Sequence, residues 1–289
     1  MALTGPIVLA VLCAALLHAG WNALIKSGGD KPLDTALIHG LGFVVAIPLL
    51  LHTGLPEPAA WPYIAASLVI HLGYYVALAG AYRHGDLGLT YPVMRGCAPM
   101  LVAIGSLPFI GEGVSPAGWI GVAVISIGVV ALGLSRSALH GGDEATRRKA
   151  LGFALANAAI IALYTVVDGI GVRASGDALA YVAALFLFDG LPYLLLVLWR
   201  RPGRRRAALA YMAGRWPVAL IGCVASLASY GIALWAMTRA PVAVVAALRE
   251  TSVLFAAVIG TVLLREPFGW QRGAGTLLIV AGVMTLRLA

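Results

Sequence analysis

Two arginines and two acidic residues lie deep inside long apolar segments of this sequence. Arg95 and Arg249 are each about nine residues, or about 13 Å at 1.5 Å per residue, from the start of an expected helix. Glu250 follows Arg249 directly, and Asp189 lies near the middle of another apolar segment. Because a charge at the centre of a bilayer costs ~3 kcal/mol or more, such groups are usually paired or line a water-filled cavity.

These charges have two interpretations, and the sequence leaves both open. As ion pairs, they would hold two parts of the protein together. As a binding site, Arg95 or Arg249 would hold a substrate carboxylate through the planar, two-point guanidinium group. Asp168, Asp189 or Glu250 would then hold an amino group or pair the arginines. Both interpretations hold if a substrate displaces a carboxylate from an arginine.

Further polar and aromatic side chains recur on single faces of other apolar segments. Asn157, Tyr164 and Asp168 follow one another at intervals of seven and four residues, which places them on one helix face. Such faces are unfavourable in lipid, so they are predicted to line an interior cavity whose aromatic walls can also donate hydrogen bonds. The remaining lining candidates are His18, Trp21, Asn22, His71, Tyr74, Tyr75, Tyr82, Tyr230 and Trp235.

These polar faces also have a purely structural interpretation. Polar side chains between membrane helices often form interhelical hydrogen bonds. A free histidine side chain has a pKa near 6.5, so His18 and His71 could carry protons or could be hydrogen-bonded packing residues.

The composition indicates that these segments belong to a polytopic membrane protein. Of 289 residues, 61% are hydrophobic and 11% are charged, and the mean hydropathy is +0.93. About 20 apolar residues cross a bilayer of ~30 Å. Such segments lie at residues 4–25, 33–52, 61–82, 87–110, 116–135, 149–170, 179–199, 216–238, 241–264 and 270–287. The sequence therefore predicts an all-α protein of ten transmembrane helices.

The sequence also contains an internal repeat. A shift of 154 positions places residues 87–134 on residues 241–288 without a gap, with nine of 48 pairs identical. Arg95 then falls on Arg249, Glu112 on Glu266, Gly121 on Gly275 and Gly128 on Gly282, and the paired glycines predict close helix packing. Glu112 and Glu266 are expected to fix the loops at helix ends. Repeated sets of membrane helices are typical of secondary transporters.

Five helices per half predict inverted repeats, because an odd number of crossings reverses the side from which the second half enters the bilayer. The first five-helix repeat is expected at residues 1–137, a cytoplasmic linker at 138–148 and the second repeat at 149–289. Fifteen of the 20 Lys and Arg lie in the loops after the first, third, fifth, seventh and ninth segments. The positive-inside rule makes those loops cytoplasmic and both termini periplasmic.

The remaining features argue against other classes of protein. Cys13, Cys97 and Cys223 are isolated within predicted spans, the six histidines are scattered, and no Gly-x-Ser-x-Gly or His-Glu-x-x-His motif occurs. We therefore expect no enzyme, no cofactor and no metal site. The net charge of +8 is explained by topology and by contact with lipid head groups, and a nucleic-acid partner is not expected. Monomer and homodimer remain open.

The whole pattern resembles the EamA family of the drug/metabolite transporter superfamily. The resemblance rests on ten helices in two halves, on Glu112 and Glu266 closing the fourth helix of each half, and on the glycine-rich helices that follow. In length and layout the chain is similar to bacterial amino-acid exporters of the YddG type. It departs from the small multidrug and guanidinium exporters of that superfamily, because residues 4–25 contain no acid.

The resemblance implies alternating-access transport across the bacterial inner membrane. With the cavity residues, it predicts an exporter of small zwitterionic metabolites, such as aromatic and other neutral amino acids. An antiporter of phosphorylated or other anionic metabolites is the alternative within transport, and a non-transporting membrane scaffold is the alternative outside it.

Overall fold

Every regular element in the described part of the chain is helical. The computed structural model describes residues 3–84, 87–133, 144–264 and 269–288. The first half contains α1 (Gly5–Lys26), α2 (Lys31–Thr53), the 3-10 turn η1 (Pro58–Ala60), α3 (Trp61–His84), α4 (Leu87–Ile110) and α5 (Pro116–Gly133). The second half contains α7 (Glu144–Arg173), α8 (Ala178–Trp199), α9 (Arg205–Met237), α10 (Val242–Arg249), α11 (Ser252–Leu264) and α12 (Trp270–Leu288).

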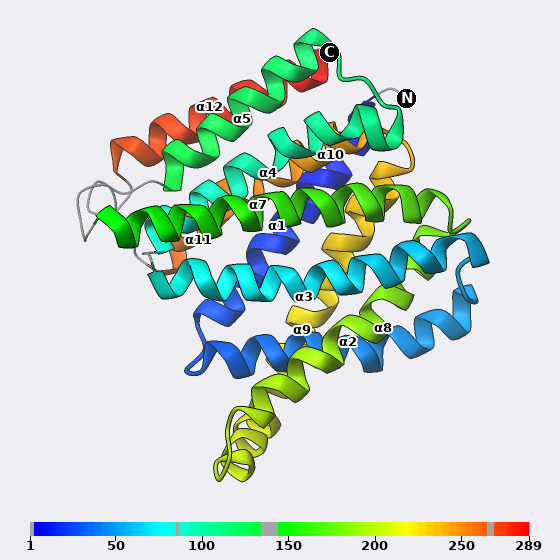
Figure 1. Cartoon of the computed structure of the whole chain (residues 1–289), viewed down its shortest axis with the longest axis vertical. Helices are drawn as coiled ribbons and strands as arrows, with labels where there is room; N and C mark the ends of the chain where they lie inside the picture. The colour runs from blue at the N-terminus through cyan, green and yellow to red at the C-terminus, as the bar shows by residue number, and fades with distance from the viewer. Residues whose placement is uncertain (1–2, 85–86, 134–143, 265–268, 289) are drawn as a thin grey trace.

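The prediction of an all-α polytopic membrane protein is confirmed. Among the described residues, nine spans are long and apolar enough to cross a membrane, with α10 and α11 together forming one interrupted span, Val242–Val262. The tenth expected segment is α12, which is less apolar because it carries Gln271, Arg272 and Arg287. The start of α1 and the end of α12 lie at the same end of the bundle, as an even number of crossings requires (Figure 1).

The packing of helices is the same when each helix is replaced by its counterpart in the other half. This symmetry is expected of an inverted repeat. Helix α3 packs against α7 and α9 packs against α1, whereas α2 pairs with α8 and α5 pairs with α12. The turn between α1 and α2 and the turn between α7 and α8 share a sequence pattern, a basic residue followed four positions later by an aspartate. Lys26 and Asp30 match Arg173 and Asp177 in spacing, and each aspartate accepts backbone hydrogen bonds at the start of the next helix.

Helix α7 is longer than the apolar segment expected at residues 149–170. Helix α7 is already formed at Glu144, within the residues expected to form a linker. Glu144 and Arg148 form an i, i+4 ion pair of 2.7 Å, and an acidic residue in the first turn favours the helix. Residues 138–143 of the expected linker lie outside the described residues.

The predicted role of the repeated glycines is confirmed. Helices α5 and α12 lie side by side (Figure 1), with each glycine against the backbone of the other helix. A Cβ on Gly128 would come within 2.9 Å of the Ile279 nitrogen, and one on Gly275 within 2.6 Å of the Leu132 nitrogen. Only glycine allows such an approach.

A second close crossing positions a histidine of the candidate site. A Cβ on Gly190 of α8 would lie 1.9 Å from the carbonyl oxygen of His39 on α2. The backbones of α2 and α8 therefore touch at this point. His39 is thereby held beside Asp189, the residue before Gly190.

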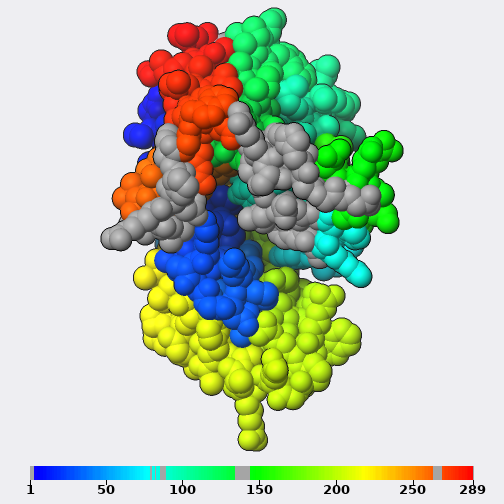
Figure 2. All heavy atoms as spheres, turned by 90° about the vertical axis from the view of Figure 1, so that its left-hand side faces the viewer, coloured from blue at the N-terminus to red at the C-terminus, as the bar shows by residue number. Residues whose placement is uncertain are grey.

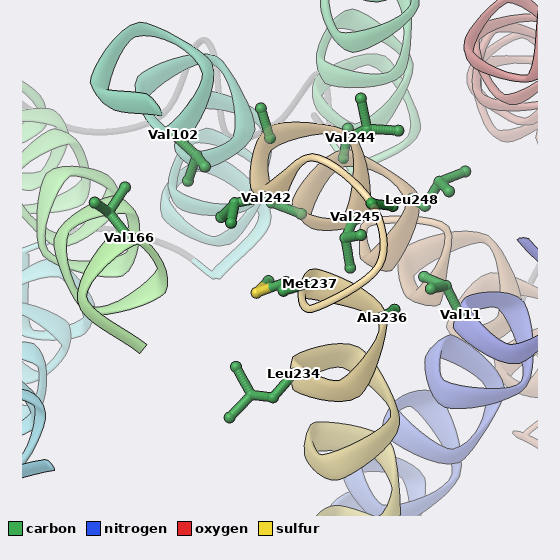
Figure 3. Packing of buried hydrophobic residues seen from close by; sticks show 14 of the residues in the cluster. Val11, Val102, Val166, Leu234, Ala236, Met237, Val242, Val244, Val245 and Leu248 are labelled. Carbon is green, nitrogen blue, oxygen red and sulfur yellow. The ribbon is translucent and has the colours of Figure 1, made fainter. Parts of the chain in front are cut away.

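The main core forms around the turn between α9 and α10. Leu234 and Met237 of α9 and Val242, Val245 and Leu248 of α10 are buried there (Figure 3). Valines of α1, α4 and α7 reach the same cluster and are labelled in the figure: Val11, Val102 and Val166. This packing fixes α10 against both halves just before the span is interrupted.

The turn between α8 and α9 projects from the lower end of the molecule (Figures 1 and 2). Helix α9 has 33 residues, about 50 Å of helix, so its first turns extend beyond a bilayer. Ion pairs attach this projection and the start of α9 to the α1–α2 turn and the first turn of α2. Arg201 binds Asp30 through two hydrogen bonds of 2.6 and 2.9 Å, and Arg215 binds Asp34 at 2.7 Å.

Candidate functional site

The buried charges meet where α10 ends and α11 begins. The helix is interrupted at Glu250 and Thr251, which brings Glu250 to face α4 of the other half. Arg95 Nε lies 2.9 Å from Glu250 Oε2, and Arg95 also donates a 3.3 Å hydrogen bond to the Ser252 hydroxyl. The Arg95 Nε–H bond is not directed at Glu250 Oε2, so this contact is an ion pair without good hydrogen-bond alignment.

Arg249 lies near Arg95 but contacts an aromatic ring instead of a carboxylate. Its guanidinium carbon lies 5.1 Å from the ring centroid of Tyr230, a cation–π distance. Within the described residues, no acidic side chain lies in ion-pair contact with it. Arg249 and Arg95 line one void of about 10 Å³ together with Glu250 and Tyr164. A space of this size holds about one water molecule, so the arginines are enclosed in this structure.

Asp168 is buried beside this group but does not line the void. Its Oδ1 accepts a 2.8 Å hydrogen bond from the Tyr181 hydroxyl, and its Oδ2 accepts one from the Tyr230 hydroxyl. Tyr230 therefore contacts Asp168 through its hydroxyl and Arg249 through its ring. The two candidate charges are connected by one aromatic side chain.

A partly exposed set of aromatic rings extends from the void. His71 Nδ1 lies 3.5 Å from Asp189 Oδ1, with 15% and 18% of the two side chains exposed. The rings of His71 and Tyr164 are 4.7 Å apart, and those of Tyr74 and Tyr164 are 6.4 Å apart. Because these residues belong to α3, α7 and α8, the set connects the two halves.

The set continues to α2 and α1 on the same interior surface. Tyr75 stacks on Tyr193 at 4.9 Å, Tyr193 contacts His39 at 6.4 Å, and Trp21 contacts His39 at 6.0 Å. His18 packs edge-on against Trp21 at 5.3 Å. These polar rings form one continuous surface, which residue spacing alone could not show.

Two sequence-predicted residues are placed differently, and a third is not described. The Asn22 side-chain amide donates a hydrogen bond to the carbonyl oxygen of His18, one turn earlier in α1, so in this structure it binds the backbone of its own helix. Trp235 lies apart from the other candidates, in a cleft of about 720 Å³ between α7, α8 and α9, where Arg239 lies 4.9 Å from its ring. The side chain of Tyr82 lies outside the described residues.

The glutamate after α4 connects helix ends from both halves. Glu112 Oε1 lies 2.8 Å from Arg173 at the end of α7, and its Oε2 accepts a 3.0 Å hydrogen bond from the Val242 nitrogen at the start of α10. Arg173 also donates to the carbonyl oxygens of Met237 and Ala240. The expected role of Glu112 in fixing helix ends is confirmed. Glu266, its repeat partner, lies outside the described residues.

Sequence reasoning missed His39, Tyr181 and Tyr193. Each carries a polar aromatic ring within an apolar segment, which was the signal used for the other candidates. Tyr181 and Tyr193 lie eight residues before and four residues after Asp189 on α8, a spacing that could have marked one helix face, whereas α2 contributes only His39. Only the crossing of these helices brings the residues to the site. No cluster of metal ligands occurs in the described part of the chain.

Comparison with known proteins agrees with this architecture. Residues 148–288 match the EamA-like transporter family. One crystal structure, described only as that of a protein, superposes with a TM-score of 0.75 at 22% identity, covering 99% of this chain and 98% of the other. No curated protein matches the chain. The match lies in the second half of the chain, where the sequence is similar to a family of membrane transporters.

Proposed function

We propose that this protein exports small zwitterionic metabolites, in particular aromatic and other neutral amino acids, as exporters of the YddG type do. The proposal depends mainly on Arg249. It is a cation within a membrane span, lies against Tyr230 and has no ion-paired carboxylate among the described residues. A guanidinium in this position can bind a substrate carboxylate at two points.

The surroundings of Arg249 suit the rest of such a substrate. Asp189, paired with His71 and still partly exposed, offers a carboxylate for an amino group. Tyr74, Tyr75 and Tyr164 supply aromatic walls with hydroxyl groups, which suit apolar and aromatic side chains. Glu250 neutralises Arg95, so the site offers one available cation and one available anion.

Binding requires movement, which supports alternating access. The void beside the arginines holds about one water molecule, too little for an amino acid. At the interruption between α10 and α11, the Glu250 and Thr251 amides bond to carbonyl oxygens three residues earlier, and the change from regular α-helix gives the span a place to bend. Contact between Glu112 and Arg173 closes one end of the bundle and would have to open during transport.

A counterflow assay in proteoliposomes tests the substrate class. Unlabelled candidates loaded inside should drive uptake of labelled phenylalanine. Arg249→Ala should lower the rate at least about tenfold, and Arg249→Lys should restore only part of it because lysine lacks the two-point fork. Arg206→Ala, an exposed position on α9, is the matched control.

The outcomes of this assay separate the proposal from its alternatives. Exchange driven by sugar phosphates, with competition by inorganic phosphate, would favour the anionic-metabolite antiporter. An absence of flux for every solute from folded protein would favour a membrane scaffold. Parental transport by Arg249→Ala would refute the assigned role of the arginine.

We further propose a bacterial inner-membrane location with both termini periplasmic, and repeats at residues 1–137 and 149–289. The basic α8–α9 turn, including Arg204, Arg205 and Arg206, would then meet cytoplasmic lipid head groups. A reporter active only in the cytoplasm should be silent after Ala289 and active near Gly203. The reverse pattern would contradict this orientation.

A further inference from the structure

Asp168 is a fully buried carboxyl group whose role differs from that of the other charges. Its side chain is 0% exposed, and Tyr181 and Tyr230 occupy its two oxygens. It therefore cannot accept a substrate amino group in this arrangement. In the described residues no Lys, Arg or His forms an ion pair with it.

A lone carboxylate in this position is costly to keep ionised. Two tyrosine hydroxyls can stabilise the anion, but they supply no compensating charge. Uptake of a proton would remove the charge, and the resulting carboxyl O–H could donate to one of the same tyrosine oxygens. The Asp168 carboxyl group therefore has a hydrogen-bond partner in either protonation state, which a proton-binding site requires.

The surrounding helices present few ionisable groups to Asp168. Helix α3 contributes His71, which acts on it electrostatically, and Ser67, which faces it without hydrogen-bond geometry. The other nearby groups are Tyr164 on α7, Tyr181 on α8 and Tyr230 on α9. Arg249, at the end of α10, contacts the ring of Tyr230, and Glu250 follows it.

Two less tightly packed regions lie near Asp168, which is itself fully buried. On one side, His71 is partly exposed beside Tyr164. On the other side, the 720 Å³ cleft is lined by Val172, one turn after Asp168, and by Leu227 and Gly231, which flank Tyr230 in sequence. A small helix movement could therefore open the carboxyl group to either side.

We propose that Asp168 binds and releases the proton that drives export, and that Tyr230 links this proton to the substrate at Arg249. The inference rests on the proposed function. The Tyr230 hydroxyl donates a hydrogen bond to Asp168, and its ring lies against Arg249. Protonation of Asp168 and binding of substrate to Arg249 therefore both affect the Tyr230 side chain. A substrate carboxylate bound to Arg249 weakens the cation–π contact between Arg249 and Tyr230, so the tyrosine can reorient. This reorientation changes the hydrogen bond that stabilises the Asp168 carboxylate.

The proposed cycle conserves protons and involves no redox step. Water on the outer side gives a proton to Asp168 Oδ, and the same proton is returned to water on the inner side. Substrate moves outward on Arg249 in the other half of the cycle. Export is then proton antiport.

Proteoliposomes with an imposed pH gradient test this coupling. With the interior acidic by about one pH unit, the parent should concentrate labelled phenylalanine about tenfold for each proton exchanged. Asp168→Asn should abolish this accumulation while phenylalanine still equilibrates in counterflow. Asp177→Asn is the matched control, because asparagine keeps the exposed helix cap of α8. Tyr181→Phe should reduce the accumulation several-fold.

Infrared difference spectra test the proton site without any substrate. Between about pH 5 and about pH 9, the parent should gain and lose the carbonyl band of a protonated carboxyl group, and Asp168→Asn should lack that change. Asp177→Asn and Tyr181→Phe should keep the band.

The two assays separate the failure of each idea. Counterflow without any response of the parent to the pH gradient would overturn the coupling and leave the proposed function intact. Gradient-driven accumulation by Asp168→Asn equal to that of the parent would overturn the role of Asp168. If Asp168→Asn does not fold, the absence of a titrating carboxyl band in the parent would overturn it as well. Failure of counterflow itself would count against the proposed function.

Discussion

Arg95 of α4 and Glu250 at the α10–α11 break form an ion pair between the two halves, with 2.9 Å between Nε and Oε2. The side chains are 12% and 6% exposed, so neither charge is fully hydrated. Because the pair joins repeated helices of opposite halves, it can hold them together and can also yield when a carboxylate substrate enters. Its energetic and functional roles can be measured separately.

Removing either Arg95 or Glu250 alone should destabilise the folded protein more than removing both. Arg95→Ala or Glu250→Gln alone should each destabilise the protein by about 3–5 kcal/mol, because one buried charge loses its partner. The double variant should recover much of this loss. Thermal unfolding in detergent, analysed as a double-mutant cycle, measures the coupling. Additive losses would show that the two residues do not stabilise one another.

Cysteine accessibility should distinguish a hydrated cavity from dry helix packing. In a variant lacking Cys13, Cys97 and Cys223, single cysteines at Tyr75 and Tyr164 should react with a small charged thiol reagent, because solvated cysteines form thiolate readily. Substrate should slow the reaction by occupying or closing the cavity.

The neighbouring positions Val76 and Leu163 supply controls for this experiment. Both side chains are exposed on the outside of the bundle, where they would face lipid. Cysteines there should not react with the charged reagent. Equal inertness at all four positions would show that the aromatic surface is dry.

Alanine at Gly275 should separate α5 from α12. The new Cβ would lie 2.6 and 2.7 Å from the nitrogen and Cα of Leu132, and backbone cannot move aside as a flexible side chain can. A loss of about 1–3 kcal/mol is expected in detergent unfolding, despite the better helix propensity of alanine. Gly152→Ala, where no atom lies within 4 Å, should be neutral or stabilising. Equal effects at both sites would contradict close packing.

The contact between Asp30 and Arg201 should make stability depend on pH. The Arg201 guanidinium, through its hydrogen bonds, lowers the pKa of Asp30 below the ordinary value of 3.8, against a smaller opposing effect of burial. A lowered folded-state pKa stabilises the protein above the unfolded value and loses that contribution as pH falls through the folded value. Melting curves should therefore show this contribution intact at neutral pH and lost below about pH 4.

Asp30→Asn removes the charge and keeps a helix-capping group at the start of α2. It should lower the melting temperature by roughly 2–4 °C at neutral pH, because a partly exposed pair contributes about 1 kcal/mol. At low pH it should match the parent. A difference between the two proteins that persists unchanged below about pH 3 would contradict the ionic origin of the effect.

Sequence alone determined the membrane class, the helical fold, the repeat and the glycine contacts. The membrane imposes these features one segment at a time, since each span must be apolar and each close crossing needs small residues. Residues such as Gly128 and Gly275 could be assigned because their local spacing already defines a helix face. Arg95 and Arg249 could be marked as unusual for the same reason, since the cost of a charge depends on depth alone.

Only the tertiary structure decided which partner each unusual residue has. Arg95 pairs with Glu250 because α10 is interrupted there, and Arg249 faces Tyr230 for the same reason. Asp168 is separated from solvent by two tyrosines from other helices, whereas Trp235 turns to a different cleft. Such contacts arise where segments distant in sequence cross, and the angle and depth of each crossing depend on packing over whole helices.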